Sequence, residues 1–292
     1  MSQGVIIEGR GGLYTVADAK GAQHVLRAKG IFRLRGQTPL VGDRVRFTPG
    51  TGEEHGWVDE ILPRTSECLR PPVANIELLC IVVAPVPEPD WLLVDKLLLF
   101  ARLQRIRPLL VVNKADISGN VFVQAQAMYR GAQVDVLSVS ALEEESLTSL
   151  REAMLGSLAC LAGQSGVGKS RLISTLLGIE LASGSVSRRT RRGRQTTRHI
   201  SLLEERGLRV LDTPGFSLLE APGNLEAADL PPLYPEFDPY LGRCYFSPCL
   251  HDREPGCAVI EAEAAGLIDA ERMARYRVLL DEIKQNWRDR YG

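Results

Sequence analysis

The sequence lacks the features that mark membrane and secreted proteins. None of its apolar runs approaches the roughly 20 residues of a membrane-spanning helix, and Met1-Ser2-Gln3-Gly4 does not open a signal peptide. Net charge is almost absent too, because 35 basic residues against 36 acidic ones leave −1, so overall charge gives no reason to expect nucleic acid. We therefore expect a cytoplasmic protein with no membrane partner.

Cysteine is also scarce, with six residues in the chain. In a cytoplasmic protein these are not expected to form a set of disulfides. Cys80 and Cys160 lie inside apolar, strand-like runs and are predicted core residues, while Cys68 carries no clear signal. The other three cysteines cluster near the C-terminus and need a different explanation.

A helical period is missing from the first 62 residues. Short alternating runs separated by glycines predict instead a small all-β domain, an OB-like β-barrel over residues 1–68. Such barrels often bind single-stranded nucleic acid, but Tyr14, Phe32 and Phe47 are best interpreted as core aromatics. A chain of 292 residues exceeds what one core serves, so one or two further domains are expected.

After a proline-containing linker at residues 63–72, apolar strands alternate with helices. This rhythm predicts an α/β domain over residues 69–220, with a parallel sheet covered on both faces. The expected strands are 78–84, 108–113, 134–138, 157–162, 199–203 and 208–211, and the expected helices are 92–104, 121–130, 143–155 and 172–177.

A P-loop lies between the fourth of these strands and the helix after it. Its residues are Gly163, Gln164, Ser165, Gly166, Val167, Gly168, Lys169 and Ser170, followed by Arg171. In a G-x-x-x-x-G-K-[ST] loop the glycines let backbone N–H groups surround phosphate oxygens, Lys169 adds a positive charge, and the Ser170 hydroxyl reaches Mg²⁺. The pattern predicts binding of nucleotide phosphates.

A guanine-reading motif, Asn113-Lys114-Ala115-Asp116, follows the second expected strand. The Asp116 carboxylate can accept hydrogen bonds from the ring N–H and the amino group of guanine together, which adenine cannot match. Asn113 would brace the neighbouring loops. Ser140 and Ala141 follow the next strand, where GTPases place a loop that contacts the guanine oxygen, although a helix-capping serine would look the same.

The switch regions are expected after the P-loop. Asp212-Thr213-Pro214-Gly215 has the D-x-x-G form in which the aspartate holds Mg²⁺ through water and Gly215 senses the γ-phosphate. Thr196 or Thr197 would reach Mg²⁺, and the choice between them stays open. The arginine-rich loop around these threonines is therefore predicted to be switch I. Its arginines suit either a phosphate or plain solvent, and they are Arg188, Arg189, Arg191, Arg192, Arg194 and Arg198.

Catalysis departs from the Ras-like pattern in this region. Phe216 stands where those enzymes keep the glutamine that orients the attacking water, so intrinsic hydrolysis is expected to be slow. Gln195 is the nearest polar candidate for that task, with an ordinary exposed loop amide as the alternative. The motif order is also shifted: the guanine loops precede the P-loop, which makes the domain circularly permuted and joins its switches directly to the C-terminal segment.

That C-terminal segment, residues 221–292, contains the remaining cysteines. Three thiols and one imidazole within fourteen residues match the four soft ligands of one structural Zn²⁺ ion, against the alternative of four unconnected loop residues. These candidate ligands are Cys244, Cys249, His251 and Cys257. Asp269 should cap a final helix whose apolar stripe, Met273 to Trp287, is predicted to pack rather than to bind a partner.

With the barrel, the permuted motifs and the C-x4-C-x-H-x5-C pattern together, the chain resembles the bacterial, small-ribosomal-subunit-dependent, circularly permuted GTPases of ribosome biogenesis. The resemblance implies hydrolysis of GTP to GDP stimulated by the small subunit, contact of barrel and zinc domain with its rRNA, and late maturation of that subunit. A monomer is expected. Members of the family commonly have histidine where Gln195 stands.

Two other classes of protein were weighed. A GTP-dependent metabolic enzyme needs a second substrate pocket with its own acid or base, and the sequence offers no such set. A nucleotide-insensitive RNA-binding scaffold could retain the P-loop fold, but Ser170 and Asp212 as Mg²⁺ ligands argue against it.

Overall fold

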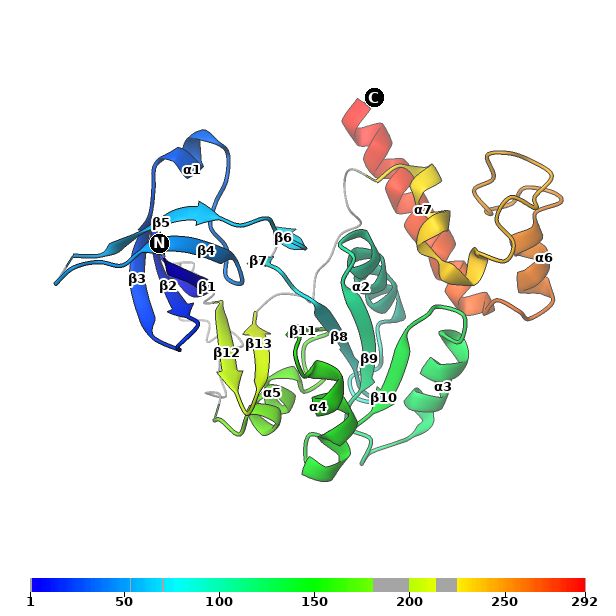
Figure 1. The fold of residues 1–292 in the computed structure, drawn as a ribbon. Helices are drawn as coiled ribbons and strands as arrows, with labels where there is room; N and C mark the ends of the chain where they lie inside the picture. The colour runs from blue at the N-terminus through cyan, green and yellow to red at the C-terminus, as the bar shows by residue number, and fades with distance from the viewer. Residues whose placement is uncertain (1, 53, 70, 181–199, 214–224, 292) are drawn as a thin grey trace, which may run out of the picture.

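The computed structural model describes residues 2–52, 54–69, 71–180, 200–213 and 225–291 (Figure 1). A β-barrel, an α/β domain and a helical C-terminal module follow one another along the chain. The barrel and the C-terminal module lie on opposite sides of the α/β domain (Figure 1). Within the described ranges, no helix is both long enough and apolar enough to cross a bilayer.

The predicted N-terminal barrel is confirmed. Its strands are β1 (Ser2–Arg10), β2 (Leu13–Asp18), β3 (Gln23–Ala28), β4 (Arg44–Thr48) and β5 (Gly56–Ile61), with the short helix α1 (Ile31–Leu34) between β3 and β4. The strand order β1-β2-β3-β5-β4 closes because β1 also pairs with β4, and β3 runs parallel to β5. Alternation along the strands turns fully buried Ile6, Leu26 and Phe47 inward, which is why the pattern was readable in the sequence.

The predicted linker is more ordered than its prolines suggested. It contains a hairpin of β6 (Glu67–Leu69) and β7 (Pro72–Ala74), which lies across the expected domain border at residue 68. Before the hairpin, Arg64 pairs with the fully buried Asp43 of the barrel at 2.8 Å. After it, the Asn75 side chain donates to the carbonyl oxygen of Gly42. These contacts fasten the linker to the barrel.

The α/β domain has the predicted parallel sheet. Its strands are β8 (Leu78–Val83), β9 (Arg107–Val112), β10 (Asp135–Ser138), β11 (Leu158–Ala162), β12 (Ser201–Glu205) and β13 (Leu208–Asp212), in the order β10-β9-β8-β11-β13-β12. Its helices are α2 (Trp91–Leu103), α3 (Asn120–Met128), α4 (Thr148–Met154) and α5 (Lys169–Leu177), with a 3-10 turn, η1 (Glu144–Leu147), before α4. Only β12 in this set runs antiparallel to its neighbour.

Both faces of this sheet are covered, as expected. Residues of β8 alternate between two cores: Leu79, Ile81 and Val83 face α2 and α3, while Leu78 and Cys80 face α4 and α5. Such double coverage explains why the strand reads as an unbroken apolar run. The first core continues into the barrel interior. At the other side of the sheet β12 pairs with β1, with Glu8 opposite Ser201, so the sheet runs from the α/β domain into the barrel.

The C-terminal module consists of short elements packed against one long helix. They are the 3-10 turns η2 (Ala227–Asp229), η3 (Pro231–Leu233) and η4 (Pro235–Phe237), the helix α6 (Ala258–Ala264) and the long helix α7 (Ala270–Tyr291). Asp269 caps α7 as predicted, since its Oδ1 accepts from the Arg272 N–H at 2.9 Å. The apolar stripe of α7 packs into a core of its own, except that Trp287 is 51% exposed.

A buried network of charges holds α7 against α2. Asp95 of α2 accepts from Arg272 and from Arg275, each at 2.6 Å, and from the Tyr129 hydroxyl at 2.7 Å. Asp95 and Arg272 are almost completely buried. Because removing one member of such a network leaves a buried charge uncompensated, the network fixes where the module sits on the α/β domain.

Candidate nucleotide site and metal centre

The P-loop forms the turn between the end of β11 and the start of α5. Gly163 has φ +133 and Gly168 has φ +97, which L side chains rarely adopt. Neither position has space for a side chain, because a Cβ would lie 2.2 Å from the Val82 carbonyl oxygen at Gly163 and 2.4 Å from Asn113 Nδ2 at Gly168. The two glycines therefore allow the tight turn and the close approach of the guanine-motif asparagine.

Lys169 begins α5 and folds back over the loop. Its Nζ donates to the carbonyl oxygens of Gly163 at 2.7 Å and of Gln164 at 2.6 Å. Burial lowers the pKa of Lys169 from 10.5 to about 8. A phosphate group beside the ammonium would favour its charged form and replace these carbonyl contacts with stronger, charge-assisted ones.

Asn113 connects three loops that are far apart in the sequence. Its Nδ2 donates to the Val167 carbonyl oxygen of the P-loop at 2.8 Å, and its Oδ1 accepts from the Ala141 N–H at 3.1 Å. The neighbouring Ala115 N–H donates to the Val139 carbonyl oxygen at 3.0 Å. The structure thus brings the P-loop, the N-K-x-D motif and the Ser140–Ala141 loop together, as GTP binding requires.

Asp116 and Ser140 contact each other directly. The Ser140 hydroxyl donates to Asp116 Oδ1 at 2.6 Å. Ser140 is completely buried and its own N–H donates to the Ser146 hydroxyl. One carboxylate oxygen of Asp116 is therefore held by a fixed partner, which orients the side chain that would recognise guanine.

A further segment, residues 86–90, contributes to the site and was missed in the sequence. Lys114 Nζ donates to the carbonyl oxygens of Val86 and Gly166, joining this segment to the P-loop. Gln164 accepts from the Asp90 N–H and donates to the Glu88 carbonyl oxygen. The segment 86–90 could have been predicted from its position just after β8, because ligands bind at the carboxyl ends of parallel strands.

The predicted magnesium side of the pocket lies at the ends of two neighbouring strands. β11 and β13 pair in parallel, and they lead to the P-loop and to Asp212, respectively. Ser170 and Arg171 are exposed in the first turn of α5, and Ser165 and Gly166 are exposed in the P-loop before it. Thr213 is buried, with its Oγ1 3.5 Å from the sulfur of Cys160. Ser170 and Asp212 therefore approach the phosphate site from separate elements.

Several predicted residues lie outside the described ranges. They are Gln195, Thr196, Thr197, Gly215, Phe216 and the six arginines between 188 and 198. The interpretations given to them above remain predictions from the sequence.

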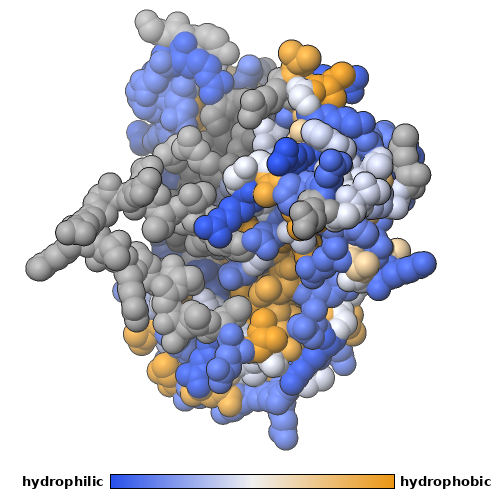
Figure 2. Space-filling view, turned by 90° about the vertical axis from the view of Figure 1, so that its left-hand side faces the viewer, coloured by the Kyte–Doolittle hydropathy of each residue, from blue (hydrophilic) through white to orange (hydrophobic). Residues whose placement is uncertain are grey.

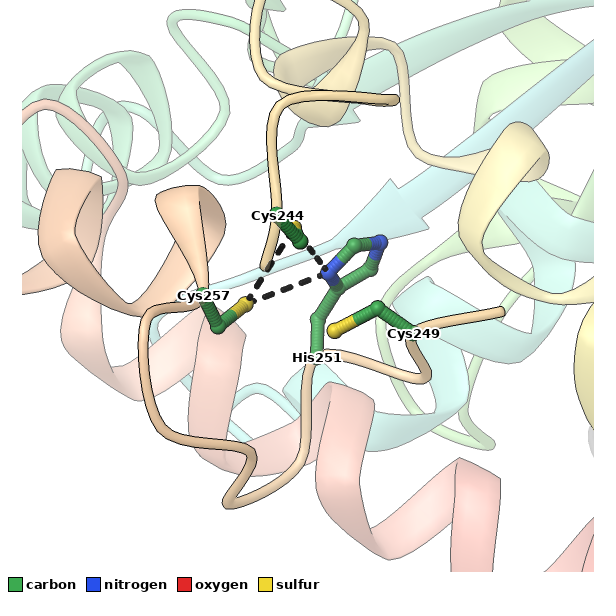
Figure 3. Close-up of side chains that lie close together, drawn as sticks. All are labelled: Cys244, Cys249, His251 and Cys257. Carbon is green, nitrogen blue, oxygen red and sulfur yellow. Dashed lines mark hydrogen bonds between the residues drawn. The ribbon is translucent and has the colours of Figure 1, made fainter. Parts of the chain in front are cut away.

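The second candidate site is the cluster of Cys244, Cys249, His251 and Cys257 (Figure 3). One donor atom from each of the four lies within 4.8 Å of the others. His251 Nδ1 is 3.2 Å from the Cys257 sulfur and 3.5 Å from that of Cys244. Burial raises the pKa of the Cys249 thiol to about 12 and also raises that of Cys257. A bound cation is what would stabilise thiolates here, so the donor set fits a metal ion.

Glu254 organises the loop that carries these ligands. Its carboxylate accepts from the backbone N–H groups of Leu250, Asp252 and Arg253, and these bonds lower the pKa of Glu254 against the opposing effect of burial. His251 has a left-handed backbone with φ +55, and the edge of its ring meets Phe237. Backbone bonds and packing thus preset the imidazole between the thiols.

A family model described as "RsgA GTPase" matches residues 61–222, and one described as "RsgA N-terminal domain" matches residues 3–58. The first covers more than half of the chain and includes every described residue of the nucleotide site.

Two curated relatives are similar over nearly their full lengths. A protein of Ruminiclostridium cellulolyticum is 41% identical over 97% of this chain and 94% of its own, and one of Geobacillus thermodenitrificans is 40% identical over 98% of both. Each is named small ribosomal subunit biogenesis GTPase RsgA.

Solved structures agree with these matches. The crystal structure of YjeQ from Thermotoga maritima superposes with a TM-score of 0.81 at 29% identity, covering 97% of this chain and 98% of that one. YloQ, described as a circularly permuted GTPase, gives 0.79 at 30% identity over 98% and 96%.

Proposed function

Because the chain belongs to the RsgA family of small ribosomal subunit biogenesis GTPases, we propose that its GTP hydrolysis accompanies late maturation of the small ribosomal subunit. The chain is a circularly permuted GTPase. The observation that carries the nucleotide part of the proposal is the Asn113 side chain, which joins the P-loop to both guanine-side loops.

In the proposed guanine site, Asp116 accepts from the base while Ser140 holds its other oxygen. The Ser140–Ala141 loop faces the same space because Asn113 binds the Ala141 N–H. Lys114 spans the P-loop and the segment 86–90, so its aliphatic stem lies where it can cover the base. The fixed acceptor gives selectivity for guanine over adenine.

The phosphates would be held by the P-loop N–H groups and by Lys169, with Arg171 in the first turn of α5. Ser170 and Asp212 fit a magnesium ion, which would neutralise negative charge on the β- and γ-phosphates. Gln195, Thr196, Thr197 and Gly215 belong to this proposal on the sequence pattern alone.

Zinc is the ion that best fits the second site. Three sulfurs and one nitrogen are soft ligands in the number that a closed tetrahedral site requires, which would leave no position for a substrate. The ion would be structural: it would cross-link the loop between η4 and α6, within which the four ligands lie.

For the partner, we propose contact with small-subunit rRNA by the barrel. The outer faces of β3, β4 and β5 carry exposed Arg27, Arg46 and Trp57, with Trp57 opposite Arg27. The aromatics named from the sequence, Tyr14, Phe32 and Phe47, are buried or half-buried, and Trp57 was not among them. Figure 2, which views the molecule from the barrel side, shows apolar residues in orange within a mainly hydrophilic surface. Arginines beside an exposed aromatic suit an RNA backbone with stacked bases.

The proposal also includes the domain borders, the oligomeric state and the location of the protein. Domain borders are proposed at residues 1–68, 69–220 and 221–292, and the protein is proposed to act as a monomer in the cytoplasm, where small subunits mature.

The test is the GTP hydrolysis rate of the full chain with and without purified small ribosomal subunits. The expected result is a slow basal rate that rises manyfold with small subunits and not with large ones. A nucleotide-insensitive RNA-binding scaffold would bind small subunits equally with GTP, GDP or no nucleotide and would show no stimulation. That outcome would overturn the proposal.

A further inference from the structure

The metal-binding loop carries two exposed aromatic side chains that neither the nucleotide site nor the metal ligands use. Tyr245 is 83% exposed and Phe246 is 45% exposed. Their rings form a T-shaped pair with centroids 5.0 Å apart and planes at 83°. In Figure 1 the orange chain around residue 250 projects from the side of the molecule opposite the barrel. Large aromatics exposed in this way mark a contact surface.

The backbone around the aromatic pair is held in place by several contacts, so the two rings keep a defined position on the surface. Cys244 and Cys249 bracket the pair and belong to the metal cluster. The Tyr245 N–H donates to the Gly256 carbonyl oxygen at 2.9 Å. Gly256 has φ +65, and a Cβ there would lie 3.1 Å from Tyr245 Cβ. The glycine therefore lets the two segments of the loop, around residues 245 and 256, pass close to each other. The backbone that carries the pair is therefore already held in place, which lowers the entropy lost on binding.

The charge around the pair is positive on its exposed side. Arg243 is exposed and makes no ion pair with any residue of the described ranges. The Arg253 side chain is 90% exposed, and its Nε lies 3.8 Å from the Asp252 carboxylate. The acids of the same loop are already engaged: Glu254 binds three backbone N–H groups, and Asp252 pairs with Lys284 at 3.3 Å. A negatively charged partner therefore meets the guanidinium group of Arg243, and that of Arg253 is held only by one long, exposed contact to Asp252.

We propose that Tyr245 and Phe246 form a stacking site for an unpaired base of small-subunit rRNA, with Arg243 and Arg253 contacting the adjoining phosphates. The inference rests on the proposed function, because it takes the small subunit as the partner. It adds a specific side-chain pair and a mode of recognition. Aromatic faces accept any base, so the site contributes affinity and position rather than sequence selectivity.

RNA fits this surface better than a protein partner does. A stable protein interface needs a wider apolar core depleted of charged residues. Here two rings stand beside two arginines, and the next residues, Ser247 and Pro248, are exposed without enlarging the aromatic surface. Stacking with phosphate contacts uses both features.

The test compares binding of the full-length, zinc-loaded chain to purified small subunits. Tyr245→Ala and Phe246→Ala should each weaken binding about tenfold, as loss of one base stack does. Tyr245→Trp should retain wild-type binding, and Tyr245→Leu should weaken it like alanine, because leucine offers apolar area without a π face. Leu267→Ala, at a 69% exposed apolar residue of the same module, is the matched control and should change nothing.

Two further measurements separate stacking from charge and from misfolding. Arg243→Ala should weaken binding mainly at low salt and reduce the salt dependence, whereas Tyr245→Ala should leave the salt dependence unchanged. Zinc content and basal GTPase rate should stay at wild-type values in all these variants. Chemical probing of the rRNA should show one unpaired base whose protection is lost in Tyr245→Ala.

The outcomes are distinguishable from failure of the proposed function. If the wild-type chain does not bind small subunits, the proposed function is wrong. If it binds and Tyr245→Leu binds equally well, the pair acts as a general apolar contact to protein and the stacking site is wrong. Equal binding of Tyr245→Ala and Phe246→Ala with the wild type would also overturn the inference.

Discussion

Asn113 shows how one side chain can organise a binding site. Its amide donates to the P-loop and accepts from the Ser140–Ala141 loop, and it occupies the space that a side chain at Gly168 would need. Each bond is an ordinary neutral one, but both partners are buried backbone groups that have no access to water. Unsatisfied buried groups of this kind cost about 1–3 kcal/mol each.

Asn113→Ala should therefore loosen the whole pocket. Both GTP and GDP should bind about tenfold or more weakly, by similar factors, because the lost contacts brace loops and do not touch the γ-phosphate. Affinity for fluorescent GTP and GDP analogues measures the effect. Asn120→Ala, at the exposed start of α3, is the matched control and should bind both nucleotides normally. A selective loss of GTP alone would argue against the bracing role.

Asp116→Asn should change base preference instead. Asparagine replaces one acceptor oxygen with a donor, so it should bind xanthine, which has an oxygen in place of the guanine amino group, better than guanine. We expect the GTP-to-XTP preference to fall at least a hundredfold, measured by competition binding. Ser140→Ala removes the bond that orients Asp116, together with a longer bond from the Leu142 N–H, and should weaken GTP severalfold without favouring XTP. An unchanged preference in Asp116→Asn would show that residues 113–116 do not contact the base.

At this scale the sequence predicted residues that belong to motifs and missed those that act through tertiary contacts. The residue types of the P-loop and of the N-K-x-D motif predict their binding roles, because the spacing along the chain determines which groups face the phosphate or the base. Nothing in the sequence around Gln164 predicts that it holds the segment 86–90. Its two hydrogen bonds to residues 88 and 90 form only because β8 and β11 pair. Trp57 was passed over because exposure on a barrel face depends on register.

At the scale of elements, long periodic segments were predictable and short ones were not. Barrel strands and the β8 run repeat a burial pattern that survives into the fold. The expected helix over 143–155 instead divides into η1 and α4. Ser146 explains this division, because its hydroxyl donates to the Glu143 carbonyl oxygen and accepts from the Ser140 N–H, which favours a 3-10 turn over a regular helix. The hairpin β6–β7 and helix α6 are too short to show a period.

The metal loop is an element whose shape depends on Glu254. Glu254→Gln keeps an acceptor oxygen but removes the charge that holds three N–H groups. We expect zinc affinity to fall about tenfold, the lower end of the effect of outer-shell partners on metal sites. Competition with a chromogenic chelator measures it. Glu263→Gln, whose partner is Arg277 on α7, lies in the same module away from the ligands and should keep wild-type affinity.

Removing the metal should disorder the metal loop of the C-terminal module and leave nucleotide binding by the α/β domain unchanged. A strong chelator should expose the loop between η4 and α6 to protease, since the ion is its main cross-link, while α7 stays attached through the buried Asp95 network. GTP affinity should change less than twofold. Limited proteolysis with mass spectrometry locates the new cuts. Loss of nucleotide binding together with the metal would mean that the two sites are one folding unit.

At the scale of the whole molecule, the α/β domain is attached to its two neighbours by different kinds of contact, buried ion pairs on one side and strand pairing on the other. The C-terminal module is fixed through Asp95 to α2. The barrel instead joins β12, the strand that follows the predicted switch I, through β1. Glu77 reinforces this junction: its carboxylate contacts Arg44 of the barrel at 3.4 Å and Arg209 of β13 at 3.5 Å. It also accepts from the Leu158 N–H of β11 at 2.8 Å.

This arrangement gives a reason why RNA binding at the barrel could reach the phosphate site. β13 leads to Asp212 and β11 leads to the P-loop, so a shift of the barrel acts on both strands that end at the phosphates. Glu77→Gln should weaken this connection while leaving every nucleotide ligand in place. We expect the basal GTPase rate and GTP affinity to stay within twofold of wild type and the subunit-stimulated rate to fall severalfold.

The matched control for this prediction is Glu144→Gln. Glu144 also contacts two arginines, Arg151 at 3.6 Å and Arg206 at 3.2 Å, but all three belong to the α/β domain. Both substitutions weaken partly exposed ion pairs worth at most about 1 kcal/mol. Glutamine at position 77 also keeps an oxygen that can accept from the Leu158 N–H, so neither substitution should unfold the protein. If the stimulated rates of the two variants fall equally, or neither falls, the Glu77 junction does not carry the signal. A drop confined to Glu77→Gln, with small-subunit affinity unchanged, would place the coupling between barrel and strands β11 and β13.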